Sequence, residues 1–323
     1  MTGALVHRVL LDGRRAVGVE FSSGGETRTA RTRGEVVLAA GAIGSPHLLE
    51  MSGIGRGEIL HALGIPVRQE LAGVGENLQD HLQARAVYRS TRPTLNDEVN
   101  HPLRKMLIGL EYVLFRRGPM SMGASQVCIF ARTHPSLELP DVQFHIQPLS
   151  SDAPGEGLHR YSAFTASVCQ LRPESRGRIV PRSPDPREAP AIYPNYLATR
   201  ADQAAIVAGM KLSRRLAATS ALRPFIVEEL APGPRVRTDE ELLEHARNSA
   251  TTIYHPVGTC RMGIDAGAVV DPRLRVRGIA GLRVADASIM PTLTSGNTNA
   301  PCIMIGEKCA QMILVDAAQR SRA

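Results

Sequence analysis

The pattern of apolar and polar positions begins with a predicted hairpin. Residues 4–11 (ALVHRVLL) and 16–21 (AVGVEF) are rich in aliphatic, β-branched positions and predict two strands. The pair Asp12-Gly13 lies between them. Both residues tolerate positive φ, so the pair favours a tight turn that joins antiparallel strands. The chain therefore opens with sheet structure.

A strand–turn–helix unit follows the predicted hairpin. Residues 36–40 (VVLAA) form a continuous apolar run, which is typical of a buried parallel strand. Two glycines then allow the chain to turn. We expect a short helix with Ser45 as its cap, Pro46 in its first position and Gly53 at its end. Such a unit forms a nucleotide-facing edge in many α/β folds, and an ordinary strand-to-helix connection is about as common.

The pattern changes between residues 82 and 249, where prolines become frequent. Residues 142–150 and 177–183 predict strands, and residues 200–218, apolar at helical spacing and free of proline, predict a helix. We find neither an internal repeat nor a low-complexity segment. The middle of the chain therefore predicts a sheet with helices, distinct from what precedes it.

The C-terminal quarter contains a polar constellation. His255 follows the aromatic Tyr254 and enters a Pro-Val-Gly turn, and residues 282–288 predict a strand with Asp286 near its end. A polar loop at residues 294–299 (TSGNTN) then opens a helix. A helix start is a local positive pole that suits an anion or a polarised oxygen. A histidine, a polar loop and a helix terminus together indicate a redox or acid/base site.

Composition bounds the class of protein. The 323 residues are 43% hydrophobic and 21% charged, enough for one large globular domain or two ordinary ones. The net charge of +7 comes mostly from scattered arginines, and aromatic residues make up only 4%. Nucleic-acid binding favours a basic stripe with interleaved aromatics, so we predict a solvated basic surface and no nucleic-acid partner.

Cysteine use and hydropathy bear on location and metals. Five dispersed cysteines predict no disulfide framework, and without a CxxC or His/Cys cluster we predict no metal site. The longest apolar run, residues 36–43, is far shorter than the roughly 20 residues of a membrane helix. No segment has the pattern of a signal peptide. We predict a cytoplasmic location and leave peripheral membrane association open.

Three motifs resemble the glucose-methanol-choline (GMC) family of flavoproteins: residues 41–55 (GAIGSPHLLEMSGIG), residues 73–81 (GVGENLQDH) and residues 255–263 (HPVGTCRMG). The resemblance extends over the whole chain. It implies an α/β fold, in which an incomplete, Rossmann-like FAD-binding domain (residues 1–81 and 250–323) is interrupted by a sheet-plus-helix substrate domain (residues 82–249).

The resemblance also implies contacts with the cofactor FAD. In the family, a valine on the first strand lies beside the adenine, and that residue is Val6 here. A plain sheet valine is the alternative. Asp286 matches a residue that contacts FAD, with a structural acid at a strand end as the alternative. The residues expected to contact the cofactor are Val6, Ala40, Gly41, Tyr254, Asp286, Ala287 and Thr298.

Two residues are expected to act in catalysis. By resemblance the protein oxidises an alcohol to an aldehyde or ketone with hydride transfer to flavin N5, and His255 matches the family's catalytic histidine. A histidine near neutral pKa suits removal of the hydroxyl proton. Asn297 matches a position where the family carries histidine or asparagine, and its amide could hold the substrate oxygen. Its alternative role is to cap the following helix.

Two further residues are expected at the substrate. His145 resembles an active-site histidine of choline-oxidising members, although a histidine facing out of a strand is as common. Those members bind the trimethylammonium group through a glutamate, and our alignment places Gln126 there, with an ordinary polar residue as the alternative. A glutamine carries no charge to hold a cation, so we predict a neutral primary or secondary alcohol as the substrate.

One family feature is missing. GMC proteins open with a GxGxxG unit whose backbone approaches the FAD pyrophosphate, whereas the close glycines of residues 53–58 and 73–78 do not follow a strand at the right spacing. We therefore expect the C-terminal part of a GMC protein. The alternatives are a non-catalytic fragment that requires a separate N-terminal part, and a flavin-binding lyase. The electron acceptor, oxygen or a quinone, is left open.

Overall fold

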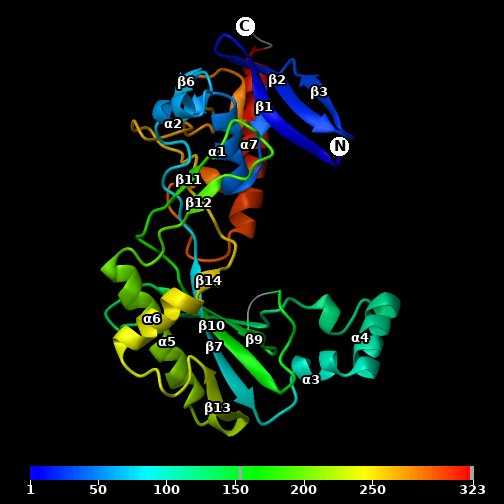
Figure 1. Cartoon of the computed structure of the whole chain (residues 1–323), viewed down its shortest axis with the longest axis vertical. Coiled ribbons are helices and arrows are strands. Elements are labelled where there is room, and N and C mark those ends of the chain that lie inside the picture. The colour runs from blue at the N-terminus through cyan, green and yellow to red at the C-terminus, as the bar shows by residue number, and fades with distance from the viewer. Residues whose placement is uncertain (153–154, 321–323) are drawn as a thin grey trace. The chain divides into compact units, whose positions relative to one another are not determined.

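The computed structural model describes residues 1–152 and 155–320, and its contacts divide the chain into two compact units (Figure 1). Unit 1 is assembled from three separate segments, Met1–Asp80, Ser175–Tyr196 and the chain from Tyr254 onward. Unit 2 contains His81–Glu174 and Leu197–Ile253.

Unit 1 combines short sheets with helices. Its strands are β1 (Ala4–Asp12), β2 (Arg15–Ser23), β3 (Glu26–Arg31), β4 (Val36–Leu38), β5 (Ile54–Gly55), β6 (Gln69–Glu70), β11 (Arg178–Val180), β12 (Ala191–Tyr193) and β15 (Leu282–Val284). Its helices are α1 (Gly41–Met51), α2 (Gly57–Ala62), the short 3-10 helix η3 (Ala287–Ile289) and α7 (Asn299–Arg320). The predicted α/β class is confirmed.

The N-terminal hairpin is confirmed. Strands β1 and β2 pair antiparallel, and Asp12 faces Arg15 across a two-residue turn in which Gly13 has φ +54°. This conformation is strained for a residue with a Cβ, so the glycine accounts for the turn. Strand β3, which the sequence analysis did not identify, extends the sheet antiparallel to β2.

The predicted parallel strand is confirmed, but its predicted burial is only partly correct. Strand β4 pairs in parallel with β15, which lies far along the chain. Leu38, Leu282 and Val284 from this pair are almost fully buried in the apolar core of unit 1. Val37 is 40% exposed and lines a hollow with Ala39 and Ala40, so this strand is covered on one face only.

The start of helix α1 differs from the prediction. The helix begins at Gly41, so Ser45 and Pro46 lie inside it, whereas its end at Gly53 (φ +77°) is as predicted. A proline inside a helix leaves the carbonyl four residues earlier without its N–H donor. Here the hydroxyl of Thr259 donates to the Ala42 carbonyl at 2.6 Å. A distant residue therefore makes the internal proline tolerable.

The segment Ser175–Tyr196 packs with unit 1, although the sequence analysis grouped it with residues 82–249. Its backbone pairs at Leu78–Gly177, and the Ile179 N–H donates to the Gly75 carbonyl at 2.7 Å. The Arg56 guanidinium donates to the Ile179 carbonyl, also at 2.7 Å. These bonds give the segment its backbone partners in unit 1, while the functional division into domains remains a prediction.

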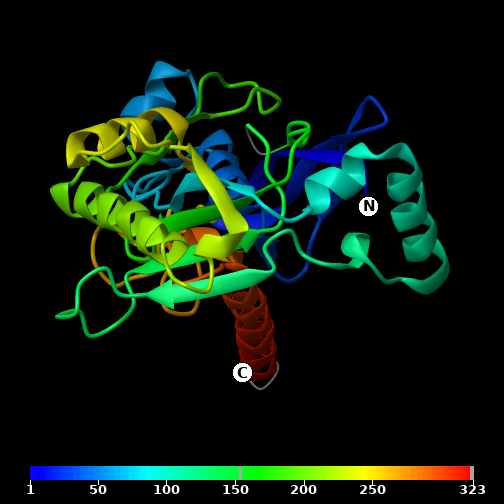
Figure 2. The same cartoon turned by 90° about the horizontal axis from the view of Figure 1, so that it is seen from below.

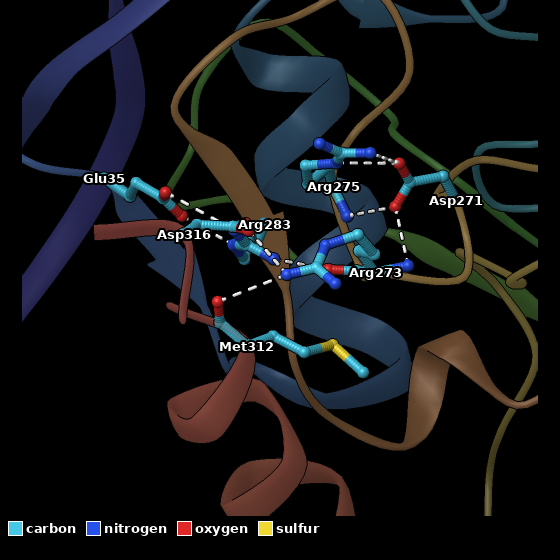
Figure 3. Close-up of polar contacts among 7 residues, drawn as sticks. All are labelled: Glu35, Asp271, Arg273, Arg275, Arg283, Met312 and Asp316. Carbon is cyan, nitrogen blue, oxygen red and sulfur yellow. Dashed lines mark hydrogen bonds and ion pairs between the residues drawn. The ribbon is translucent and has the colours of Figure 1, made fainter. Parts of the chain in front are cut away.

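A group of charged side chains, here named the arginine cluster (Glu35, Arg273, Arg283 and Asp316), ties α7 to the β4–β15 pair (Figure 3). Arg283 is 1% exposed and donates to Glu35 and to Asp316, each at 2.5 Å. Arg273 also donates to Asp316 at 2.5 Å. Because a buried guanidinium is costly without partners, these contacts are what makes its burial acceptable.

Unit 2 is built on one antiparallel sheet in the order β13-β7-β10-β9-β8, with β14 added to β7. Its strands are β7 (Leu82–Ser90), β8 (Val127–Ala131), β9 (Val142–Gln147), β10 (Ala163–Gln170), β13 (Ile226–Ala231) and β14 (Thr251–Thr252). Its helices are α3 (Leu95–Asn100), α4 (Pro102–Phe115), η1 (Pro119–Ser121), α5 (Arg200–Ala217), η2 (Arg223–Phe225) and α6 (Asp239–Ser249).

Helices α5 and α6 cover one face of this sheet. Phe144 and Val168 from the strands pack against Ile206 and Met210 of α5 and Leu242 of α6. The alternation of strand side chains sends the polar residues of β9 and β10 to the opposite face. Strand β9 and helix α5 confirm the elements predicted at residues 142–150 and 200–218.

Among the described residues, no helix has the length and apolarity needed to cross a membrane. The same part of the chain holds no group of three or more His, Cys, Asp or Glu side chains arranged to bind a metal.

Candidate functional site

His255 lies in a buried loop of unit 1 and is 9% exposed. Its backbone N–H donates to Asp80 Oδ1 at 2.9 Å, and the other oxygen of Asp80 accepts a bond from the Tyr196 hydroxyl at 2.5 Å. Asp80 is therefore oriented by two partners that come from two other segments of the chain. This anchoring holds the backbone that carries the imidazole.

The structure brings His255 and Asn297 together. The Asn297 amide nitrogen lies 3.3 Å from His255 Nε2. With the ring proton on Nδ1, the amide N–H donates to Nε2. Burial lowers the pKa of His255, with the Asp80 charge opposing this shift. The neutral ring therefore presents a basic nitrogen beside an amide donor, the pair that proton removal from a hydroxyl requires.

Residues of the motif at 73–81 hold the histidine loop. Gln79 and Val257 exchange two backbone hydrogen bonds at 2.9 and 3.1 Å, and the Gln79 side chain accepts from the Leu293 N–H at 3.0 Å. Gly258 has φ +92°, and a Cβ there would lie 2.5 Å from the Asn77 carbonyl oxygen. The HPVGT turn therefore requires glycine at this position.

We name these residues the histidine network: Asn77, Gln79, Asp80, His255 and Asn297. The sequence analysis identified His255 and Asn297 but missed Asp80, Gln79 and Tyr196. Asp80 lies in the family-like motif at residues 73–81, which was the available signal. The tyrosine lies in a segment with no motif, and only the fold brings it to the site.

Asp286 serves as a structural link. Its Oδ2 accepts bonds from the Gly41 N–H at 2.9 Å and the Ser45 hydroxyl at 2.6 Å, and its Oδ1 accepts from the Ser288 N–H at 2.8 Å. The carboxylate thus lies at the N-terminus of α1, where a negative charge is stabilised. This geometry agrees with the structural alternative for Asp286, and Gly41 takes part through its backbone.

Val6 and Ala40 line the same hollow in unit 1. The hollow has a volume of about 450 Å³, and Val36, Leu38 and Leu48 contribute to its apolar wall. An apolar recess of this kind fits a flat ring system. These two of the expected cofactor neighbours are therefore brought together by the fold.

The other expected cofactor neighbours lie beside the catalytic candidates in the chain. Tyr254 precedes His255, is 75% exposed and has φ +63°. Thr298 is buried, and its carbonyl accepts the Cys302 N–H in the first turn of α7. Since α7 begins at Asn299, the residue immediately before the helix is Thr298. The Ala287 carbonyl accepts from the Gly258 N–H at 3.3 Å.

The substrate candidates His145 and Gln126 share one face of the sheet in unit 2. His145 is 6% exposed, and its Nδ1 lies 3.0 Å from the Gln83 amide nitrogen on β7. The backbone N–H of Gln126, just before β8, donates to the Ile146 carbonyl at 3.0 Å. With Val127 opposite Ile146, strand alternation directs Gln126 to the face that carries His145.

A buried hydroxyl on this face has no partner. Ser167 pairs with His145 across β9 and β10, and its Oγ is buried without a hydrogen-bond partner in the described part of the chain. Buried polar atoms are normally satisfied, so an orphan is compatible with a ligand contact. The polar face of unit 2 therefore has hydrogen-bonding capacity left for a small molecule.

The chain matches known proteins over most of its length. Two family models described as GMC oxidoreductase match residues 1–83 and 173–306. Human mitochondrial choline dehydrogenase is 44% identical over 311 residues, which cover 96% of this chain and 52% of that protein. An oxygen-dependent choline dehydrogenase of Pseudomonas fluorescens is 42% identical, covering 97% of this chain and 56% of that protein. The chain spans about half the length of the curated relatives it matches.

Solved structures have the same fold. Formate oxidase superposes with a TM-score of 0.91 at 25% identity, over 98% of this chain and 60% of that one. Pyridoxine 4-oxidase from Mesorbium loti gives 0.81 at 29% identity, over 96% of this chain and 57% of that one.

Proposed function

The chain belongs to the GMC oxidoreductase family, and from this membership we propose that it carries out FAD-dependent oxidation of an alcohol to an aldehyde or ketone. The observation that carries the proposal is the approach of the Asn297 amide to the basic Nε2 of His255 at 3.3 Å. Both groups can meet one substrate oxygen, because they are already within hydrogen-bond distance of each other.

The two side chains have complementary roles. His255 accepts the hydroxyl proton at Nε2, which its lowered pKa keeps unprotonated near neutral pH. Asn297 donates an amide hydrogen to the oxygen as negative charge develops there. Bound FAD would supply the acceptor for the hydride that leaves the carbon bearing this oxygen. Asp80 is a positioning residue, because it bonds the His255 backbone and not the reacting atoms.

The described residues of unit 1 fit part of a flavin cofactor. We propose that Val6 and Ala40 hold the adenine in their apolar hollow of about 450 Å³. We further propose that Gly41, Tyr254, Ala287 and Thr298 contact FAD, and that Asp286 supports them through its bonds to Gly41 and Ser288. The positive end of α7 beside Thr298 favours an anionic group.

The domain roles follow from the same proposal. Residues 1–81 and 250–323 serve the cofactor, and residues 82–249 serve the substrate. Within the latter range, the stretch from Ser175 to Tyr196 supports unit 1, as its backbone bonds indicate.

Flavin content and reduction test the proposal. The purified chain is desalted, its FAD is measured by absorbance, and an alcohol is added without oxygen. We expect bound flavin that bleaches. A parallel protein joins this chain to the N-terminal part of the Pseudomonas fluorescens relative. If only this hybrid binds and reduces flavin, the fragment alternative holds. Bound flavin that no alcohol reduces in either protein would overturn the proposal and favour the lyase alternative.

The substrate class follows from Gln126. In choline-oxidising members a glutamate is expected at this place, and glutamine supplies no charge for a cation, so we propose a neutral primary or secondary alcohol. Gln126→Glu should lower the KM of choline relative to that of an uncharged alcohol roughly tenfold. Gln203→Glu, on helix α5 and therefore on the other face of the sheet, is the matched control. An unchanged KM ratio for Gln126→Glu would count against our alignment.

The acceptor and the location are proposed at a coarser level. Reoxidation of the reduced protein by oxygen and by a soluble quinone would identify the acceptor. We propose a reducing, cytoplasmic location, which is supported by cysteines that are all free. The name of the human relative places that protein in mitochondria. Cell fractionation tests the proposed location.

A further inference from the structure

Helix α4 (Pro102–Phe115) forms an arm that stands off the sheet of unit 2 (Figures 1 and 2). None of its residues is buried. The helix contacts chiefly α3 and η1, its neighbours in the chain. A helix with little tertiary packing normally presents polar side chains to water, and this one does not.

A continuous apolar stripe follows one side of α4. The side chains recur at helical spacing and are each between 50% and 67% exposed. We name this set the α4 stripe: Leu103, Met106, Leu107, Leu110, Val113 and Leu114. The opposite side of the helix, with Ile108 and Tyr112, is half-buried. A contiguous apolar surface of this size on a single helix marks an interaction site.

Basic residues flank the stripe at both ends of the helix. Arg104 and Lys105 lie in the first turn, and Arg116 and Arg117 follow the last. Two acids, Glu111 on the helix and Glu98 on α3, line one hollow with Arg104. In the described part of the chain none of the four basic side chains forms an ion pair. Elsewhere many arginines are paired, as Arg283 is in the arginine cluster. The basic residues outnumber these acids, so the arm carries a net positive charge around an apolar face.

We propose that α4 docks on an anionic membrane surface, with the α4 stripe among the acyl chains and the four basic residues at the lipid headgroups. An amphipathic helix with apolar residues on one side and Lys or Arg at its borders lies in the plane of such an interface. Anionic headgroups complement the charge of the arm. A second copy of this chain would instead bring four more basic residues against these four.

The chain has no tryptophan, so a single one introduced at the stripe reports its surroundings. The Leu110→Trp variant is mixed with vesicles of phosphatidylcholine alone and with vesicles that also contain phosphatidylglycerol. We expect a blue shift of its emission only with the anionic vesicles, reversed by high salt. Leu139→Trp is the matched control, because Leu139 is 59% exposed in unit 2 outside the arm. Its emission should not shift.

Co-sedimentation measures the binding itself. Leu107→Glu should abolish association with the anionic vesicles, while Leu139→Glu should leave it unchanged. Lys105→Gln should weaken it roughly fivefold, the effect expected for one basic residue near the surface. Circular dichroism checks that each variant keeps its helix content.

Several outcomes would overturn the proposal. The anionic vesicles could fail to bind the chain, or Leu107→Glu and Leu139→Glu could bind them equally. A third such outcome is a dimer that forms without lipid and is lost in Leu107→Glu, measured by sedimentation velocity. This result would assign the α4 stripe to contact with a second copy of the chain.

Discussion

The two ends of helix α7 are held by different kinds of polar contact. Before its first turn, Asn297 meets His255 through uncharged donors and acceptors. Near its last turns, Asp316 is bound by the guanidinium groups of Arg283 and Arg273. The histidine network leaves a basic nitrogen beside an amide, whereas the arginine cluster uses its charges on one another. The uncharged hydrogen bonds of the histidine network can be exchanged for bonds to a substrate at little cost in free energy. The charges of the arginine cluster are already paired with one another, so this cluster only stabilises the fold.

The largest expected effect is at the arginine cluster. Arg283→Met leaves Glu35 and Asp316 without their buried partner and should lower the free energy of unfolding by about 3–5 kcal/mol. Urea denaturation measures this. Arg275→Met is the control, because Arg275 is half exposed in its pair with Asp271 and should cost at most ~1 kcal/mol. Equal losses for the two variants would show that the cluster is no more important than a surface pair.

His255, the catalytic candidate of the histidine network, should respond in activity. In flavin-loaded protein, His255→Ala should lower the rate of flavin reduction by alcohol by at least ~10²-fold, because the proton acceptor is lost. His61→Ala, an exposed histidine on α2 of the same unit, should leave the rate unchanged. A full rate for His255→Ala would remove His255 from the proposed mechanism and make the two ends of α7 equally structural.

The buried carboxyl group of Glu50 makes the stability of the folded state depend on pH. Burial raises the pKa of Glu50 to about 7 from 4.5, against the opposing charge of Arg56, while Glu76 adds to the rise. The folded state thus binds this proton more tightly than the unfolded state. The stabilisation is complete below pH 4.5 and is lost as pH rises through 7, by roughly 3 kcal/mol.

Urea denaturation of Glu50→Gln against pH tests this dependence. The variant keeps an oxygen for Arg56 and should lose the slope between pH 5 and 8, while Glu58→Gln at an exposed position should keep it. A slope that persists in Glu50→Gln would show that another group titrates.

The smallest of these effects concerns the proline inside α1. Thr259→Val keeps the shape of the side chain but leaves the Ala42 carbonyl without a donor, at a cost of about 1–3 kcal/mol. Pro46→Ala restores the N–H that this carbonyl would otherwise receive. In a double-mutant cycle, Thr259→Val should therefore cost less in the Pro46→Ala background. Strict additivity of the two changes would contradict the compensation.

Local rules predicted the elements whose causes are local. The turn at Gly13 and the helix end at Gly53 follow from positive φ at glycine, and both are as expected. The predicted start of α1 was wrong because Ser45 and Pro46 have the local pattern of a helix N-terminus. Thr259 supplies the missing donor from elsewhere in the chain, and no local pattern reveals that bond.

Prediction of the site residues from local sequence patterns has the same limit. The motif around His255 predicted the histidine, and the loop at residues 294–299 predicted Asn297. The fold brings the two within hydrogen-bond distance. Tyr196 reaches Asp80 only because its segment returns to unit 1, and the sequence contains no signal for that return. The polar face that carries His145 follows from strand alternation once β9 is known, whereas the exposed arm of α4 was not predicted.

The assembly of unit 1 from three segments has a consequence for biosynthesis. Glu35 and Arg283, which join β4 and β15, are 248 residues apart. On the ribosome, β4 emerges long before its parallel partner exists, and its apolar side chains stay without cover while all of unit 2 is made. Unit 2 can complete its sheet once β14 has emerged. Strand β4 therefore waits for its partner throughout the synthesis of unit 2, and during that time chaperone protection of residues 36–38 would matter most.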